Sequence, residues 1–380
     1  MTVAECAGAY CAAAVSIETL STAIAAFRCR RRKGLLAPPK DAPPVSIVRP
    51  LRGLDPYLKE TLASSFALDY PAYEIVFCLA DAEDPAAPLA RRLMDAHPDI
   101  PSRLLIGDDR PSANPKLNNC VKGWKAAIHQ WIIVADANVM MPRDYIQRLM
   151  ARWRADTGIV CAPPIGGAPA SFAAEVECAF LNTYQARWQY AGEACGFGFA
   201  QGKTMLWRRD ILEAAGGIEA LGAEIAEDAA ATKIIHRAGL NAHLVDGSFE
   251  QPLGLRTMRE VWSRQMRWAR LRRATFPLHF APELFTTSLF ALAAAWFGAE
   301  AFDCPPWLAL AATALLWYGG EAILAGLAGW PLSWRAPLAW FVRDLLLPCL
   351  YVEAWVSDEF TWRGNAMTVA EDGEPVGAAR

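Results

Sequence analysis

The chain has 380 residues, of which 54% are hydrophobic and only 20% are charged. A soluble protein carries about 25% charged residues and less than half apolar ones. This composition therefore predicts a globular part joined to a membrane part, and it excludes disordered, collagen-like and low-complexity chains. The net charge of −3 gives no general attraction to nucleic acid. The ten cysteines are scattered, which is typical of reduced, buried thiols rather than of a disulfide framework.

The N-terminal segment has the features of a membrane anchor. Residues 7–27 form an apolar run about long enough to cross a bilayer, and basic residues fill five of the six positions at 28–33. This order is the reverse of that in a signal peptide. We therefore expect residues 1–33 to be an anchor with its C-terminal end in the cytoplasm. Because Ser16 and Glu18 interrupt the run, a soluble helix with a basic tail is the alternative.

Residues 34–280 have the pattern of a cytoplasmic α/β domain. We expect strands at 45–50, 74–79, 103–106, 131–135 and 159–161, and helices at 55–67, 85–96, 115–128 and 142–153. Nearly continuous apolar strands that alternate with helices predict a mainly parallel sheet covered on both faces. Ligands bind at the carboxyl ends of the strands in such sheets. Polar residues at those ends are therefore candidate site residues.

Two carboxylates stand at predicted strand ends. Asp81 follows the strand at 74–79, and Asp136 follows the strand at 131–135 with Asn138 close behind. Mg²⁺ and Mn²⁺ prefer oxygen ligands that they share with substrate phosphates. Asp136 and Asn138 are therefore the candidate metal ligands, and Asp81 is a candidate nucleotide contact. Lys116 opens a helix whose first amides suit a diphosphate. Each feature alone is equally compatible with an ordinary strand end or helix cap.

Three further segments carry candidate functional residues. A glycine-rich stretch at 196–202 ends at Gly202, and Glu227 and Asp228 begin a helical stretch. Further on, Arg264-x-x-Arg267-Trp268 lies on a predicted helix rich in arginine, which suits a membrane surface and bidentate binding of a diphosphate. The alternatives are a plain glycine-rich turn, acidic residues that stabilise a helix start, and a basic helix that binds anionic lipid.

Residues 281–356 read as a second membrane part, followed by a tail at 357–380. Three apolar stretches lie at 284–298, 307–327 and 338–356. Glu321, Arg343 and Asp344 fall inside these stretches, and such charges normally face protein, water or one another. The last stretch is therefore either a crossing or a re-entrant, interfacial helix.

Taken together, these motifs resemble those of a known family. The order Asp81, Asp136, Glu227-Asp228, Arg264-x-x-Arg267-Trp268 resembles the signature of membrane-embedded inverting glycosyltransferases with a GT-A fold. Over about residues 45–365 the chain most resembles ceramide glucosyltransferases. It departs from them in two respects. Gln185 and Phe199 replace a His and a Cys that bear on substrate contacts, and Asp136-Ala137-Asn138 replaces Asp-Ser-Gly at the second aspartate.

The resemblance implies a GT-A fold with a mixed, mainly parallel sheet and terminal transmembrane helices. It implies an enzyme that moves a hexose, with glucose favoured, from a UDP-sugar to the primary hydroxyl of ceramide, forming a β-hexosylceramide with Mg²⁺ or Mn²⁺. Asp228 is then the catalytic base, with Glu227 as the second candidate. The implied contacts to the nucleotide-sugar are Asp81, Lys116, Asp136, Gly202, Arg264, Arg267 and Trp268.

Several alternatives stay open at this level. A hopanoid glycosyltransferase is the nearest, and a processive polysaccharide synthase or a non-catalytic lipid-binding protein is more distant. The short, Ala- and Arg-rich chain suggests a bacterial, multi-pass protein of the inner membrane whose catalytic domain faces the cytoplasm. The sequence leaves undecided the sugar, the lipid acceptor, the metal and the oligomeric state.

Overall fold

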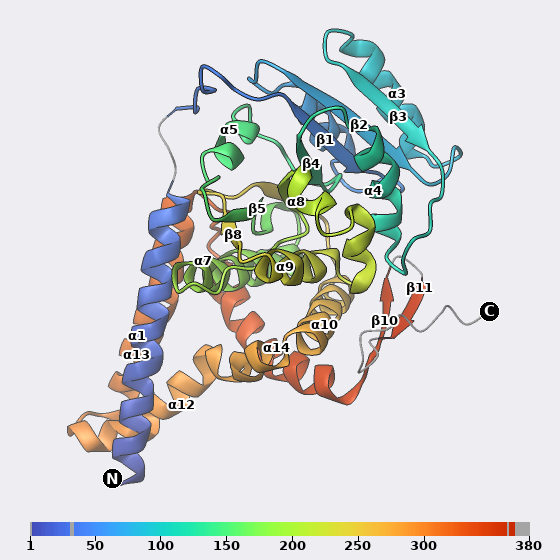
Figure 1. Cartoon of the computed structure of the whole chain (residues 1–380). Coiled ribbons are helices and arrows are strands. Elements are labelled where there is room, and N and C mark those ends of the chain that lie inside the picture. The colour runs from blue at the N-terminus through green and yellow to red at the C-terminus, as the bar shows by residue number, and fades with distance from the viewer. Residues whose placement is uncertain (1, 31–33, 363–364, 369–380) are drawn as a thin grey trace. The chain divides into compact units, whose positions relative to one another are not determined.

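The computed structural model describes residues 2–30, 34–362 and 365–368 (Figure 1). It divides into two compact units that interleave along the chain. The α/β unit is built from Arg32–Gly167 and Gly192–Gly254, and the helical unit from Met1–Arg31, Ala168–Ala191 and Leu255–Val369. The domain boundaries expected at 33/34 and 280/281 stay predictions. The basic residues Arg31, Arg32 and Lys33 lie outside the described part of the chain.

The α/β unit holds a seven-stranded sheet in the order β3-β2-β1-β4-β7-β5-β8. Its strands are β1 (Val45–Pro50), β2 (Tyr73–Leu79), β3 (Ser102–Ile106), β4 (Trp131–Ala135), β5 (Thr157–Cys161), β7 (Thr204–Arg208) and β8 (Asn241–Leu244). Only β7 runs antiparallel to its neighbours, β4 and β5. The predicted mixed, mainly parallel sheet is therefore confirmed. The sequence pattern missed β7, β8 and the small sheet of β6 (Ile165–Pro169) with β9 (Glu250–Gly254).

Helices cover the sheet of the α/β unit. They are α2 (Leu58–Ala63), α3 (Ala86–Ala96), α4 (Pro115–Ala126), α5 (Tyr145–Met150), α8 (Arg209–Glu213) and α9 (Glu227–Arg237). On one face, alternate strand residues such as Ile47 and Phe77 form a core with α2, α3 and α5. On the other face α4 packs closely at Gly123, where a Cβ atom would lie 2.5 Å from Val48 Cγ1. This close packing holds the C-terminal half of α4 against the sheet.

The helical unit contains the long apolar helices. Its elements are α1 (Val3–Cys29), α6 (Phe172–Cys178), a π-helical segment (Ala179–Ala186) that leads into α7 (Arg187–Ala194), α10 (Met258–Thr275), α11 (Pro277–Phe280), α12 (Ser288–Gly298), α13 (Pro306–Ala328), α14 (Ala336–Val356), and the hairpin of β10 (Glu359–Trp362) with β11 (Asn365–Thr368). Helices α1, α12 and α13 pack on one another, and α10 packs on α14 and α6 (Figure 1).

Two described helices, α1 and α13, are long and apolar enough to cross a membrane. A third span is possible if Pro277–Thr286 and Ser288–Phe302, which meet at a 50° bend, count as one. The charges inside α13 and α14 face one another, which is one of the arrangements that the sequence left open. Arg343 lies 2.7 Å from Glu321 and 2.8 Å from Asp344, and all three side chains are buried. A buried ion pair of this kind offsets part of the cost of placing these groups in an apolar setting.

Candidate active site

Lys116 lies at the centre of a charged cluster at the carboxyl edge of the sheet. Its Nζ lies 2.7 Å from Asp136 Oδ1 and 2.5 Å from Glu227 Oε1, and it donates to the carbonyl oxygen of Gly202 at 2.5 Å. Burial lowers the pKa of the Lys116 ammonium, but the charges of Asp136 and Glu227 outweigh burial and raise it. Lys116 is therefore a fixed cation that joins α4, the end of β4 and the start of α9.

Asn114 explains why Lys116 and Glu227 meet. It is the fully buried N-cap of α4, and its side-chain oxygen accepts from the amides of Lys116 at 2.9 Å and Leu117 at 3.1 Å. Its Nδ2 donates to Glu227 Oε2 at 2.7 Å and to the carbonyl of Ile225 at 3.1 Å. One amide side chain thus caps one helix and holds the start of another.

Asp136 receives a lysine on each of its carboxylate oxygens. Lys116 contacts Oδ1, and Lys203 Nζ lies 2.7 Å from Oδ2. Burial opposes ionisation of Asp136, but the two ammonium groups outweigh burial and hold the pKa of Asp136 well below its usual range. Asp136 is therefore an anion at any physiological pH.

Arg49 fixes the loop that carries Asp136. It lies at the end of β1 and is fully buried. Its Nη2 donates to the carbonyl oxygens of Asp136 at 2.9 Å, Ala137 at 2.9 Å and Val139 at 3.0 Å. These bonds satisfy a charge inside the core and hold the loop in one conformation. Arg49 is thus a positioning residue for Asp136 and Asn138.

Asp228 begins α9 beside Glu227 and is only partly buried. Its Oδ2 accepts from the amide of Gly202 at 3.1 Å, and its Oδ1 accepts from the amide of Ala229 at 2.9 Å. Burial and then the charge of Glu227 raise the pKa of Asp228 to about 6, against the opposing effects of Lys116 and the two amides. A carboxylate with a raised pKa is ionised at neutral pH and is a better proton acceptor than an ordinary aspartate.

Gly202 completes the cluster. A Cβ atom there would lie 2.9 Å from Glu227 Oε1, 3.3 Å from Asp228 Oδ2 and 3.4 Å from Lys116 Nζ. Because Lys116 and Asn114 hold Glu227, its carboxylate could not easily retreat from a methyl group. The close approach of backbone and side chains therefore requires glycine at this position.

Asp81 lies apart from the cluster in an exposed turn after β2. Its Oδ1 accepts from the amide of Glu83 at 3.0 Å. Strand β1 separates β2 from β4, so the strand ends that precede Asp81 and Asp136 are about 10 Å apart on the same edge of the sheet. That span suits two ends of one nucleotide, and the nucleotide contact of Asp81 stays a prediction.

The donor set at Asp136 fits a cation. Asp136 Oδ2 and Asn138 Oδ1 converge on one cationic nitrogen, Lys203 Nζ, at 2.7 and 3.3 Å. Among the described residues no group of three or more His, Cys, Asp or Glu side chains forms a complete metal cage. Mg²⁺ and Mn²⁺ bound with a nucleotide take only one or two protein carboxylates, because phosphates and water supply the other ligands. Asp136 and Asn138 are thus compatible with a cation bound together with a diphosphate.

The predicted arginine motif lies on α10 in the helical unit. Glu177 of α6 is buried, and its carboxylate binds Arg264 Nη1 at 2.5 Å and Arg256 Nε at 3.2 Å. Arg267 and Trp268 are half-buried on the same helix. Glu177 was not recognised from the sequence, and it orients the first arginine of the motif.

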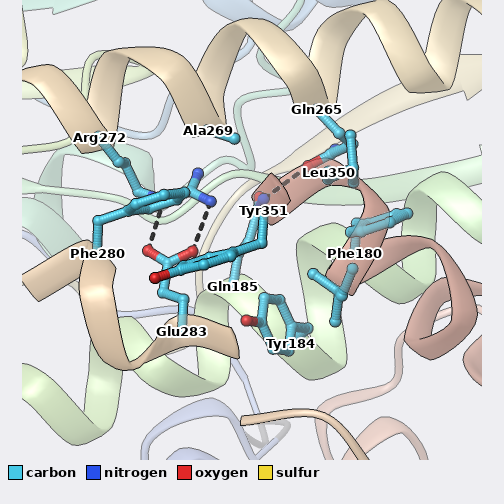
Figure 2. Close-up of a pocket in the computed structure, with 11 residues that line it drawn as sticks. Phe180, Tyr184, Gln185, Gln265, Ala269, Arg272, Phe280, Glu283, Leu350 and Tyr351 are labelled. Carbon is cyan, nitrogen blue, oxygen red and sulfur yellow. Dashed lines mark hydrogen bonds and ion pairs between the residues drawn. The ribbon is translucent and has the colours of Figure 1, made fainter. Parts of the chain in front are cut away.

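A small pocket adjoins the motif within the helical unit (Figure 2). Gln185 donates to Gln265 Oε1 at 2.7 Å, and Arg272 makes two 2.8 Å bonds with Glu283. The cavity volume is about 20 Å³, which is room for one water molecule. The buried Nε2 of Gln265 has no hydrogen-bond partner among the described residues. The pocket therefore suits a water or a single polar group, and not an acyl chain.

Comparison with known proteins places this chain in a family. The family model described as "Glycosyl transferase family 21" matches residues 9–374. The chain belongs to glycosyl transferase family 21. The predictions that it resembles the ceramide glucosyltransferase family and that it is a glycosyltransferase are thereby confirmed.

Two relatives of this family 21 member are named ceramide glucosyltransferases. "Ceramide glucosyltransferase 3" of Caenorhabditis elegans is 25% identical over 342 residues, which cover 87% of this chain and 74% of that protein. "Ceramide glucosyltransferase 1" of the same organism is 28% identical over 242 residues, 63% of this chain and 52% of that protein. These similarities concern the relatives' sequences and leave the substrates of this chain to be proposed.

A solved structure supports the fold of this glycosyltransferase. A mannosyltransferase from Pyrobaculum calidifontis, in complex with GDP-Man and Mn²⁺, aligns with a TM-score of 0.52 at 19% identity. The alignment covers 93% of this chain and 98% of the other. At this identity the likeness shows the fold alone, and it confirms the predicted GT-A architecture.

Sequence reasoning found most members of the cluster and missed others. It identified Lys116, Asp136, Gly202, Glu227 and Asp228, which the structure brings together. It missed Arg49 and Lys203, and it recognised Asn114 only as part of the segment that opens a helix, because the contacts of these residues cross between segments far apart in the chain. An arginine at the end of an apolar strand was a usable signal for Arg49, because a buried charge needs partners.

Proposed function

We propose that this family 21 enzyme transfers a hexose, with glucose favoured, from a UDP-sugar to the primary hydroxyl of ceramide. The product is a β-hexosylceramide, formed with inversion at the anomeric carbon. One observation carries the proposal: Asp228, whose pKa is raised to about 6, lies beside the Lys116–Asp136–Glu227 cluster at the ligand-binding edge of the sheet.

In this proposal Asp228 is the catalytic base. The ceramide hydroxyl loses its proton to the Asp228 carboxylate as its oxygen attacks the anomeric carbon, and UDP leaves from the opposite face. A single displacement inverts that carbon and needs no covalent sugar–enzyme intermediate. The Glu227 carboxylate is ion-paired with Lys116 and hydrogen-bonded by Asn114, whereas the Asp228 carboxylate accepts from two neutral backbone amides, which offset its charge less than an ammonium does. This difference favours Asp228 over Glu227 as the base.

The remaining residues bind the donor. We assign Asp81, Lys116 and Gly202 of the α/β unit, and Arg264, Arg267 and Trp268 of α10, to the nucleotide-sugar. Asp136 and Asn138 would hold a Mg²⁺ or Mn²⁺ ion, which when bound neutralises the diphosphate of the leaving UDP. Lys116 is held as a cation by two carboxylates and adds positive charge on the same edge of the sheet.

The location follows from the acceptor. Helices α1 and α13 are candidate membrane spans, and a ceramide would reach the enzyme sideways from the bilayer. We propose that the α/β unit faces the cytoplasm, where UDP-sugars are made, and that the membrane is a bacterial inner membrane. Protease added to spheroplasts should leave this unit intact, and its digestion would refute the orientation.

A substrate panel tests the proposed reaction. The full-length protein in lipid nanodiscs is given UDP-glucose, UDP-galactose or GDP-mannose with ceramide, a hopanoid alcohol or diacylglycerol, with and without Mn²⁺. Mass spectrometry should detect hexosylceramide from UDP-glucose, with a β linkage by NMR. A product only from the hopanoid would move the acceptor to that lipid class. No UDP release with any acceptor would contradict the enzymatic assignment.

A further inference from the structure

Lys203 is placed opposite Asp136 by the sheet itself. Strand β7 runs antiparallel to β4 with Ala135 paired to Thr204, so the next residues along each strand, Asp136 and Lys203, face each other. The amide of Asp136 donates to the carbonyl oxygen of Lys203 at 3.0 Å. The Lys203 side chain, 19% exposed, then folds onto Asp136 Oδ2 at 2.7 Å and Asn138 Oδ1 at 3.3 Å.

The Lys203 ammonium lies between the two oxygens that would hold the divalent cation. Two positive charges about 3 Å apart repel strongly in a partly buried setting, so Lys203 and a metal ion cannot share this position. Asp136 Oδ1 is already bound to Lys116. A cation that binds Asp136 and Asn138 must therefore displace Lys203, whose four-carbon stem allows its ammonium to turn away.

Charge balance shows when that displacement is favourable. Lys116 and Lys203 together offset two of the three carboxylate charges of Asp136, Glu227 and Asp228. A divalent cation alone would displace the Lys203 ammonium from its two oxygens and supply no anion in return. A cation that arrives with a nucleotide diphosphate brings that anion, and the released ammonium gains a phosphate partner.

We propose that Lys203 is an internal counter-ion that competes with the divalent cation for Asp136 and Asn138, so that the cation binds tightly only together with the nucleotide diphosphate. This inference rests on the proposed cation site of the previous section. It assigns Lys203 a regulatory contact at the donor site and makes metal binding depend on the donor. Its consequence is that the free enzyme does not hold the metal firmly between turnovers.

Mn²⁺ titration followed by the EPR signal of the free ion tests the inference on the full-length protein, with and without UDP. Lys203→Met removes the competing charge and keeps the length of the side chain. Lys203→Arg retains a positive charge. Lys125→Met is the matched control, because Lys125 forms a 2.6 Å ion pair with Glu219 on the exposed surface of the same unit. Thermal unfolding checks that each variant is folded.

In the parent, UDP should tighten Mn²⁺ binding strongly. Lys203→Met should bind Mn²⁺ without UDP about tenfold more tightly than the parent, as expected for loss of one competing ion pair in a partly buried site. In Lys203→Met the factor by which UDP tightens Mn²⁺ binding should shrink by a similar amount. By linkage, the factor by which Mn²⁺ tightens UDP binding should shrink equally. Lys203→Arg and Lys125→Met should resemble the parent.

Two results would overturn the inference, and they are distinguishable. If the parent binds Mn²⁺ with UDP but Lys203→Met binds Mn²⁺ no more tightly than the parent does, Lys203 does not compete and the cation site stands. If none of the proteins binds Mn²⁺ with or without UDP, the cation site itself is wrong, and the role of Lys203 falls with it. The transferase reaction is tested separately by the lipid products.

Discussion

Replacing Asp228 by Asn tests the proposed base most sharply. The change keeps the size of the side chain and removes its ability to accept a proton at neutral pH. In the structure Asp228 accepts from the amides of Gly202 and Ala229. Asparagine has one acceptor oxygen, so one of these bonds is lost, at about 1 kcal/mol. General-base catalysis contributes about 10²–10⁴-fold, so kcat should fall by that factor while the KM for the UDP-sugar changes less than about threefold.

The pH dependence sharpens the same test. Because the pKa of Asp228 is raised to about 6, kcat/KM of the parent should decline about tenfold per pH unit below that value. The residual activity of Asp228→Asn should lack this decline. Mass spectrometry of the product at varied UDP-glucose concentrations measures kcat and kcat/KM at each pH. Asp210→Asn is the matched control, because Asp210 is an exposed carboxylate of the same unit paired with Arg208.

As the pH rises through the pKa of Asp228, the stability of the parent should fall while its activity rises. Folding raises the pKa of Asp228 above its ordinary 3.8, so the folded state binds this proton more tightly than the unfolded state. The stability from that proton is present below pH 4 and is lost as the pH rises to about 6. Asp228→Asn has no carboxylate to titrate and therefore does not lose this stability. The difference between its Tm and that of the parent should therefore increase from pH 5 to pH 7.5.

Two outcomes would refute this reasoning. Turnover of folded Asp228→Asn within about threefold of the parent would remove Asp228 from the mechanism and make Glu227 the next candidate. A Tm difference that stays constant between pH 5 and pH 7.5 would contradict the raised pKa. Asp210→Asn should change neither the turnover nor the pH dependence of the Tm, because Asp210 and its partner Arg208 are exposed.

Three further predictions concern the surroundings. Gly202→Ala places a methyl group 2.9 Å from Glu227 Oε1, so activity should fall at least about tenfold and the Tm should also fall because the site is overpacked, and parent-like activity and Tm would contradict the close packing. Asp136→Ala should abolish Mn²⁺-dependent UDP-sugar binding in calorimetry without unfolding the protein, whereas unchanged binding would exclude Asp136 as a ligand. Arg343→Met leaves Glu321 buried without its ion pair and should lower the free energy of unfolding in detergent by about 3–5 kcal/mol; an unchanged Tm would contradict it.

The sequence by itself determined the elements that carry the site. Strands β1 and β4 begin and end where the apolar runs predict, at Val45–Pro50 and Trp131–Ala135. A short, nearly continuous apolar run flanked by polar residues is typical of a strand that is buried on both faces. The pattern therefore placed Asp136 at a strand end. Acidic residues favoured at a helix start likewise placed Asp228 at the beginning of α9.

Only the tertiary structure decided how these residues are charged and held. Strand β7 enters the sheet antiparallel between β4 and β5, and this pairing sets Lys203 against Asp136. The contact joins residues far apart in the chain, and its register depends on backbone hydrogen bonds that no local pattern encodes. The same holds for Arg49, whose buried guanidinium fixes the loop after β4. Local periodicity places a side chain on an element, whereas the charge state of a site depends on which elements the fold brings together.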